Sequence, residues 1–394
     1  MTFSTIRRAP SDLALIAGIL LLAVNLRAPF TGLAPVLALI QRDFSLSTVA
    51  VGALSSLPLL AFAAFSPISS AIARKVGLER TIVGALALVA LGIALRSSGT
   101  AWLLYFGTAV IGVGIAFGNV LLPSLIKRDF AGSVASLTGA YALTMGASGA
   151  LGSTLVTPLA QAYGWQTALA TFILLPGIAL AVWAPRRHAH RNEAVARSAR
   201  PAQPTNVWRS SLAWQVTLFM GFNAMIFYIA VSWLPTILID QGLPPAEAGS
   251  MHGVLQLATA IPGLILAPVI RRMPDQRPAA VSVSLISAAS LLGLIYLPGL
   301  AVVWAALLGF GSGASMILGL TFVGLRTRSA EGAGALSGMA QCIGYLMAAA
   351  GPMVVGAIHD WQRSWSVALL MAAGVALLGA WAGLLAGRKV HVEA

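Results

Sequence analysis

The stretch PRRHAHRNEAVARSARPAQPTNVWRS, residues 185–210, is the longest polar interval in an otherwise apolar chain. It carries six arginines together with Pro201 and Pro204. Of the 394 residues, 58% are hydrophobic and 9% are charged, which is too apolar for an ordinary soluble surface. We therefore predict a membrane protein in which this interval is a basic linker between two apolar regions.

The apolar runs on each side of the linker are long enough to cross a hydrocarbon core of about 30 Å, which takes about 20 helical residues. Six runs lie on each side, which predicts an all-α membrane protein of twelve transmembrane helices in two pseudo-symmetric six-helix bundles. The expected bundles are residues 1–184 and 211–394. The expected spans are 11–40, 48–73, 79–97, 101–126, 133–161, 165–184, 211–239, 246–270, 278–297, 299–325, 332–358 and 364–386.

The positive charges support this count. If the N-terminus is cytoplasmic, alternating gaps place 20 of the 24 lysines and arginines on the inside, as the positive-inside rule requires. Arg42, Arg96 and Arg363 fall in outside gaps, and Arg27 falls within a span. We expect a multi-pass protein of the bacterial inner membrane with both termini cytoplasmic.

The two halves share landmarks at a nearly constant offset. Pro35 and Pro235 are 200 positions apart, and Leu-Thr-Gly at 137–139 is matched 199 positions later by Leu-Ser-Gly at 336–338. This spacing favours a duplicated six-helix unit, the arrangement of transporters that rock two bundles about a site in the middle of the membrane.

Composition also argues against other classes. The one cysteine, Cys342, lies in an apolar run, so we expect no disulfide, no thiolate metal site and no metal or cofactor. The net charge of +13 is spread in short clusters between spans, which fits membrane topology better than nucleic-acid binding. The spans show no paired carboxylates and no HExxH motif, so we do not expect an enzyme.

Arg27 is the exceptional charge. It lies twelve residues beyond Leu15, about 18 Å into the membrane, where a charge costs on the order of 3 kcal/mol. All eleven acidic residues map to loops or helix ends, so its partner is either backbone carbonyls or an arriving substrate. We favour the substrate.

The prolines near this arginine predict a helix that is broken on both sides of it. Pro29 and Pro35 should leave the carbonyls of Asn25 and Thr31 without helical hydrogen bonds, and Pro123 should do the same for Asn119. Thr31 lies one turn beyond Arg27 on the same face, whereas Asn25 joins the site only if the helix bends.

Polar and aromatic side chains recur at helical spacing in other spans. Each stripe alone is more often a helix contact than a ligand site, but together with Arg27, Thr31 and Asn25 they describe an amphipathic substrate cavity. The remaining candidates are Asn119, Tyr141, Asn223, Tyr228, Trp233, His252, Gln256, Gln341 and Tyr345, with Thr259 and Ser337 completing two of the stripes.

Six plus six helices and a central basic loop resemble the major facilitator superfamily. The motifs AVNLRAPFTGLAPVL (23–37), GNVLLPSLIKRDF (118–130), YIAVSWLPTIL (228–238) and LSGMAQCIGYLMAAAGP (336–352) resemble its cyanate permease branch, most closely the bacterial 2-nitroimidazole transporters. The resemblance implies a secondary active transporter that moves a small polar or anionic solute by alternating access. A channel-like anion facilitator and a carrier of a small organic carboxylate are the alternatives.

The loop ARKVGLER (73–80) departs from the superfamily pattern, because Arg74 stands where an aspartate is expected; Glu79 is the candidate replacement charge. Proton coupling is also open. His252, whose unperturbed pKa would be about 6.5, is the candidate carrier within a span, although we favour a polar contact for it. We expect the lipid bilayer and a small molecule as partners, protons as a candidate coupling ion, and function as a monomer.

Overall fold

The computed structural model describes residues 10–130, 133–188, 207–263, 265, 266, 273, 275–328 and 330–392. These residues form helices and connecting turns, with no β-strand among them. The helices are α1 (Pro10–Thr31), α2 (Leu37–Asp43), α3 (Thr48–Val76), α4 (Leu78–Arg96), α5 (Ala101–Asp129), α6 (Val134–Ala170), α7 (Leu174–Trp183), α8 (Ser211–Asp240), α9 (Pro245–Ala258), α11 (Arg277–Tyr296), α12 (Ala301–Leu325), α13 (Ala330–Gln362) and α14 (Trp365–Ala386).

Ten helices in the described part of the chain are long and apolar enough to cross a membrane. One of them, Ser136–Arg186, covers two predicted spans and turns a corner at Gly164, where φ is +81°. A residue without a Cβ adopts this angle without strain. The predicted span 246–270 begins as α9, but positions 264 and 267–270 lie outside the described residues, as does most of the predicted linker, positions 189–206.

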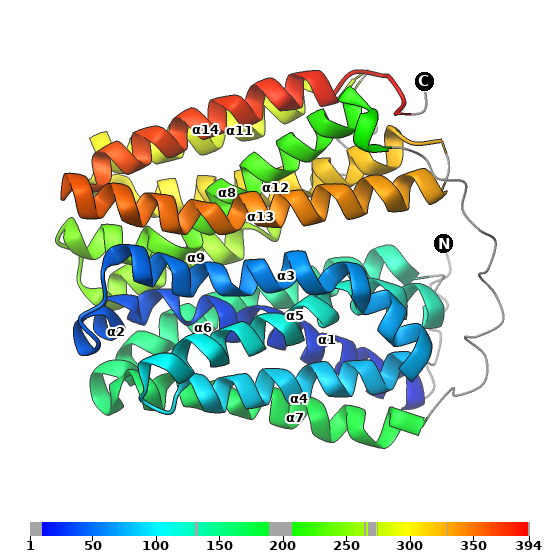
Figure 1. The fold of residues 1–394 in the computed structure, drawn as a ribbon, viewed down its shortest axis with the longest axis horizontal. Helices are drawn as coiled ribbons and strands as arrows, with labels where there is room; N and C mark the ends of the chain where they lie inside the picture. The colour runs from blue at the N-terminus through cyan, green and yellow to red at the C-terminus, as the bar shows by residue number, and fades with distance from the viewer. Residues whose placement is uncertain are drawn as a thin grey trace, which may run out of the picture.

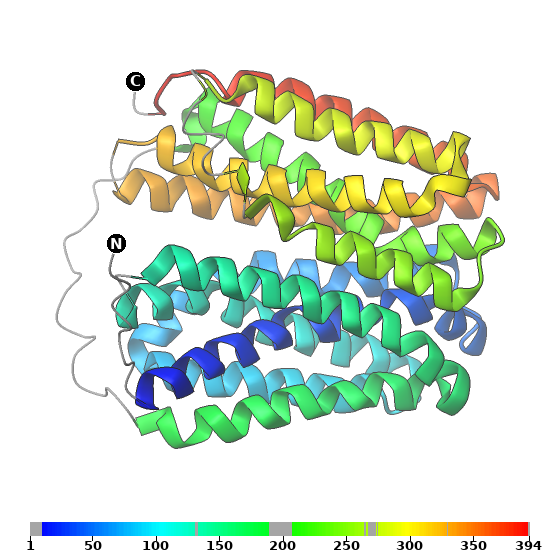
Figure 2. The ribbon, with the colours of Figure 1, turned by 180° about the vertical axis from the view of Figure 1, so that it is seen from behind.

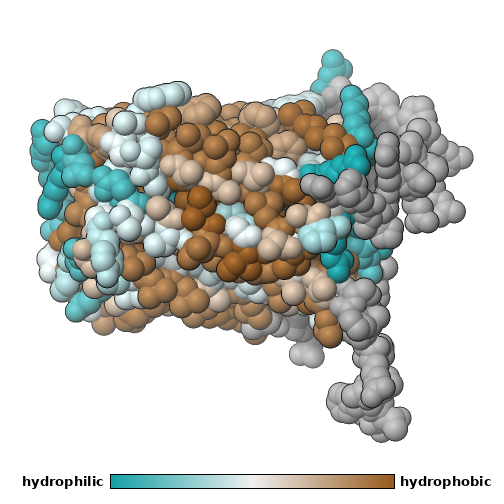
Figure 3. Space-filling model, turned by 90° about the horizontal axis from the view of Figure 1, so that it is seen from below, coloured by the Kyte–Doolittle hydropathy of each residue, from teal (hydrophilic) through white to brown (hydrophobic). Residues whose placement is uncertain are grey.

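The helices lie side by side in two groups. Figure 1 shows α1 to α7 in one half and α8 to α14 in the other, and the opposite view in Figure 2 agrees. The start of α1 and the end of α14 lie at the same end of the molecule, which we call the terminal end; the opposite end is the distal end. Figure 3 shows a broad hydrophobic band between more hydrophilic ends, as lipid contact requires.

Of the two breaks predicted around Arg27, only the one after it is present; the helix is unbroken before Arg27. α1 continues through Pro29 and ends at Thr31, and a short 3-10 helix, Ala34–Val36, leads into α2. Pro35 lies within that 3-10 helix. The carbonyl of Thr31 accepts a hydrogen bond from the Ser153 hydroxyl at 3.5 Å, so a helix of the same half supplies a donor for the carbonyl that the break frees.

One seam between the halves runs along α3 and α13. At the distal end, the Asp360 carboxylate accepts hydrogen bonds from the backbone N–H groups of Thr48 (3.2 Å) and Val49 (3.0 Å). A carboxylate is favourable here because the first N–H groups of a helix lack partners within it. Nearer the middle, the Ser56 hydroxyl donates to the Ala349 carbonyl at 2.6 Å. The halves are therefore joined by hydrogen bonds at the distal end.

The second seam lies between α6 and α9. Gly249 and Gly253 of α9 stand so close to α6 that an added Cβ would lie 3.0 Å from the Ser153 carbonyl oxygen and 3.1 Å from the Ala150 carbonyl oxygen, respectively. Small residues permit such close approach of helices in membranes. This seam brings α9 alongside the broken helix α1.

Candidate functional site

Arg27 connects the two halves. Its Nε donates to Oε1 of Gln256 on α9 at 3.1 Å, and its guanidinium carbon lies 4.9 Å from the ring centroid of Phe227 on α8. Among the described residues, no carboxylate forms a salt bridge with it. The side chain is only partly buried, and Nη1 and Nη2 have no hydrogen-bond partner in the described part of the chain. Two charged donors therefore remain available.

Thr31 and Gly149 contact the backbone and the first side-chain carbons of Arg27. The Thr31 hydroxyl donates to the Arg27 carbonyl (3.1 Å) and approaches the Gly149 carbonyl (3.4 Å), so it ties α1 to α6. A Cβ added at Gly149 would lie 3.0 Å from Arg27 Cγ, 3.4 Å from Thr31 Oγ1 and 3.5 Å from Gln256 Cβ. Sequence reasoning missed Gly149, because its role depends on contacts with two other helices.

The predicted stripe on α9 extends the site inward. Gln256 and His252 are fully buried, and Gln256 Nε2 lies 3.2 Å from His252 Nε2. Since Gln256 Oε1 accepts from Arg27, its Nε2 must donate, which assigns the lone pair to His252 Nε2 and the proton of a neutral imidazole to Nδ1. Thr259 donates to the Gln256 carbonyl at 2.7 Å. Arg27, Gln256 and His252 thus form one polar row.

A chain of aromatic rings begins at Phe227, beside the Arg27 guanidinium. Tyr228 meets Phe30 and Phe227 edge to face, with centroids 5.8 and 5.0 Å apart, and Tyr345 meets Phe62 at 5.3 Å. The ring centroids of Phe30 and Phe62 lie 6.4 Å apart, so ring contacts link Phe227 to both tyrosines. Tyr228 and Tyr345 were predicted; the three phenylalanines were not, because apolar aromatic residues carry no signal in a chain this hydrophobic.

Three predicted residues make helix contacts instead. Asn25 is fully buried and donates to the backbone one turn earlier in α1 at 2.8 Å. Asn223 accepts from the Ser284 hydroxyl at 3.3 Å, which links α8 to α11. The Trp233 indole donates to the Pro352 carbonyl at 3.0 Å, which links α8 to α13. None of them is hydrogen-bonded to Arg27 or to Gln256 in the described part of the chain, so their place in the site stays a prediction.

The last three candidates lie on other helices. Asn119 on α5 and Tyr141 on α6 are partly buried and form no hydrogen bond with another described side chain. Gln341 on α13 donates to the Ser337 hydroxyl at 2.9 Å, one turn before Tyr345. Hydrogen bonds therefore join Arg27, Thr31, Gln256 and His252, and ring contacts through Phe227 connect the two tyrosines to them. The remaining candidates form no hydrogen bond with these residues in the described part of the chain.

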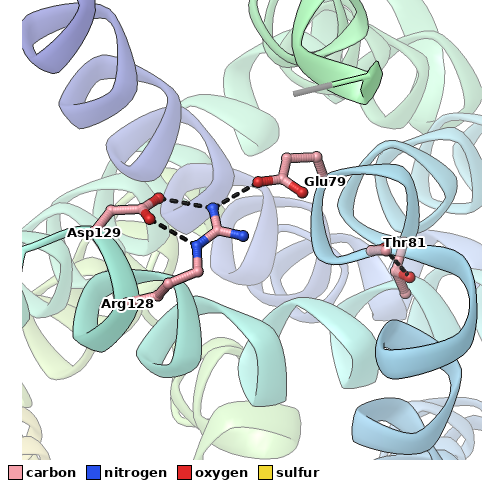
Figure 4. Close-up of polar contacts among 5 residues, drawn as sticks. Glu79, Thr81, Arg128 and Asp129 are labelled. Atoms are coloured by element: carbon pink, nitrogen blue, oxygen red, sulfur yellow. Dashed lines mark hydrogen bonds and ion pairs between the residues drawn. The ribbon is translucent and has the colours of Figure 1, made fainter. Parts of the chain in front are cut away.

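A separate charged cluster lies at the terminal end. Figure 4 shows the Arg128 guanidinium between Glu79 and Asp129; Nη2 lies 2.5 Å from Glu79 and Nε lies 2.6 Å from Asp129. Glu79 lies in the first turn of α4 and is almost fully buried, and Arg128 lies in the last turn of α5. Glu79 thus supplies a negative charge beside the loop in which Arg74 replaces the expected aspartate, and its bond stays within the first half.

The arrangement suits a small planar solute. Free Nη1 and Nη2 form a planar pair of charged donors that matches the two oxygens of a nitro or carboxylate group. The aromatic rings offer faces for a flat ring, and the amide of Gln256 keeps the guanidinium in place.

Comparisons with known proteins show the family and the fold of the chain. Residues 15–352 match the family model described as Major Facilitator Superfamily. The chain is 52% identical, over the full length of both proteins, to the 2-nitroimidazole transporter of Escherichia coli K12, and 38% identical over 384 residues to the uncharacterized transporter YycB of Bacillus subtilis 168, covering 96% of this chain and 94% of that one. A bacterial homolog of the human lysosomal transporter Spinster, solved inward-facing and unoccupied, superposes with a TM-score of 0.72 at 14% identity, covering 97% of this chain and 98% of that one.

Proposed function

Because the chain belongs to the Major Facilitator Superfamily, we propose that it moves a small planar polar or anionic solute, such as a 2-nitroimidazole or cyanate, across the bacterial inner membrane by alternating access. One observation carries the proposal: Arg27 of the first half bonds to Gln256 of the second half and keeps Nη1 and Nη2 free. The name of the 52% identical relative supports the nitroimidazole class.

In this mechanism the substrate replaces the counter-charge that the protein lacks. A nitro or carboxylate group accepts two parallel hydrogen bonds from Arg27, and its ring lies against Tyr228 or Tyr345. Because these residues come from different halves, occupancy changes the contacts between the halves. A ligand shifts such an equilibrium only by its difference in affinity for the two states, and a site shared by both halves supplies that difference.

The moving bodies are the bundles 1–184 and 211–394, joined by the basic linker 185–210 on the cytoplasmic side. With the terminal end cytoplasmic, the distal end is periplasmic, and the bonds of Asp360 to α3 close that side. The solute then enters or leaves from the cytoplasm in the present conformation. The chain acts as a monomer.

Proton coupling runs through His252, runs through a proton that travels on the substrate, or is absent. His252 reaches Arg27 only through Gln256, so protonating it adds a second positive charge to the same row. Uptake into vesicles under an imposed pH gradient tests this point, because rates that do not respond to the gradient would remove both routes and leave a uniporter.

The transport claim is tested by counterflow. Purified protein in liposomes preloaded with unlabelled 2-nitroimidazole should accumulate labelled 2-nitroimidazole transiently and saturably, and Arg27→Ala should abolish this accumulation. Flux that rises linearly with concentration and shows no counterflow would instead support a channel-like facilitator.

A further inference from the structure

The guanidinium of Arg96 is buried beside the end of the broken helix α1. Arg96 is the last residue of α4, and its side chain is only 1% exposed, although the charge pattern predicted it in a gap outside the membrane. Its Nη1 donates to the carbonyl oxygen of Pro29 at 2.7 Å. Its Nε and Nη2 are buried and have no hydrogen-bond partner among the described residues. The Pro29 carbonyl is thus the one protein acceptor that this cation has there.

The acceptor is a carbonyl that the helix break releases. In a continuous helix the Pro29 carbonyl would accept from the N–H of Leu33, but that N–H instead donates to the Phe30 carbonyl at 3.3 Å. Carbonyls at a helix C-terminus carry partial negative charge and favour a nearby cation. Arg96 therefore stabilises the end of α1 where the chain leaves helical geometry.

The backbone of Arg96 is itself held in place. α4 and α5 cross at Gly92 and Gly107, where an added Cβ on Gly107 would lie 2.9 Å from Arg96 Cα. The contact between backbones leaves α4 little freedom to move relative to α5. A side chain that starts at a fixed point and ends at the Pro29 carbonyl also limits where Pro29 can lie.

Pro29 follows Arg27 by two residues, about 200° around the helix. We propose that Arg96 is a positioning residue for substrate binding: by holding the Pro29 carbonyl from behind, it sets the height and rotation at which α1 presents Arg27 between the halves. This inference rests on the proposed role of Arg27.

Three variants test it. Arg96→Met removes every donor and keeps much of the volume, whereas Arg96→Lys retains one charged donor for the Pro29 carbonyl. Arg326→Met is the matched control, because Arg326 is 3% exposed and donates to the carbonyls of Ala386 and Gly387, far from Arg27 in the fold. We expect Arg96→Met to weaken 2-nitroimidazole binding about 10-fold, within the range for residues that act through another. Arg96→Lys should stay within about 3-fold, and Arg326→Met should lower thermal stability without changing affinity.

A double-mutant cycle identifies the route. If Arg96 acts through Arg27, adding Arg96→Met to Arg27→Gln should weaken binding no further than Arg27→Gln alone. Additive losses, or equal affinity in Arg96→Met and wild type, would overturn the inference. Unchanged affinity in Arg27→Gln would instead reject the proposed function itself.

Hydrogen exchange supplies a readout that needs no ligand. Amides of residues 31–36 should exchange faster in Arg96→Met than in wild type and should be unaffected in Arg326→Met. Equal exchange at 31–36 in wild type and Arg96→Met would contradict the positioning role, whatever the binding data show.

Discussion

Replacing Gln256 with glutamate gives Arg27 a carboxylate partner, which it does not have among the described residues. The two side chains have nearly the same shape, so Oε1 of the glutamate should stay about 3 Å from Arg27 Nε, as Gln256 Oε1 does now at 3.1 Å. The substitution therefore changes charge far more than packing. We expect the new carboxylate to compete directly with the solute for the guanidinium.

The size of the effect follows from the distance. Two unit charges about 4 Å apart interact by about 4 kcal/mol at an effective dielectric constant of about 20. Arg27 is partly exposed, so about 2 to 3 kcal/mol is realistic, which corresponds to binding about 30- to 150-fold weaker. The same attraction opposes the loss of the Gln256 Nε2 hydrogen bond to His252, so the thermal stability of the ligand-free protein should change less than the affinity.

Gln276→Glu is the control for this experiment. Gln276 is a buried amide whose Oε1 accepts from Arg326 at 2.7 Å, so the substitution also places a carboxylate beside a buried arginine, but away from the site. Titration calorimetry with 2-nitroimidazole on the purified variants should show loss of affinity in Gln256→Glu and none in Gln276→Glu. Affinity within twofold of wild type in Gln256→Glu would refute the reasoning that the solute occupies the place of a missing carboxylate.

Three further predictions concern the seam at Asp360, two glycines and the ion pair of Arg128. Asp360→Asn weakens the two hydrogen bonds that join the halves at the distal end. A cysteine placed at Ser56, in a background without the native cysteine, should then react several-fold faster with a thiol reagent added from the periplasm. An unchanged rate would show that these bonds do not close the distal end. Gly149→Ala should weaken solute binding, because its methyl group would meet the side chain of Arg27. Gly77→Ala is the control: its φ of +104° should cost about 1 to 3 kcal/mol of stability, and the open space around it should leave affinity unchanged. Paired melting and binding curves would show both results. Arg128→Gln leaves the buried Glu79 carboxylate without its cation and should lower the melting temperature; a melting temperature equal to that of wild type would contradict this prediction.

The sequence was informative where a residue's effect is local. Proline chemistry predicted the break after Thr31, and helical spacing predicted that His252 and Gln256 share a face. The absence of intramembrane acids in the sequence predicted that Arg27 would lack a carboxylate partner. Each of these conclusions depends on neighbours within one or two turns of the same helix.

Contacts between helices were much less predictable. Asn223 and Trp233 have the polarity of ligand-binding residues, but rotation of α8 directs them to α11 and α13. Gly149 matters only because α6 passes Arg27 and Gln256 at close range. The charge pattern placed Arg96 in a gap outside the membrane, whereas in the structure it is buried and donates to the Pro29 carbonyl at the end of α1. Such roles depend on crossing geometry, which helical periodicity does not encode.

The central claim is that the planar guanidinium of Arg27 binds the solute through its two free nitrogens. The most direct test is the dissociation constant of purified Arg27→Lys for 2-nitroimidazole, beside wild type. Lysine keeps the charge but cannot donate two parallel hydrogen bonds in one plane. We predict binding at least about 10-fold weaker in Arg27→Lys, from loss of one charge-assisted hydrogen bond. Equal dissociation constants for the two proteins would contradict the account.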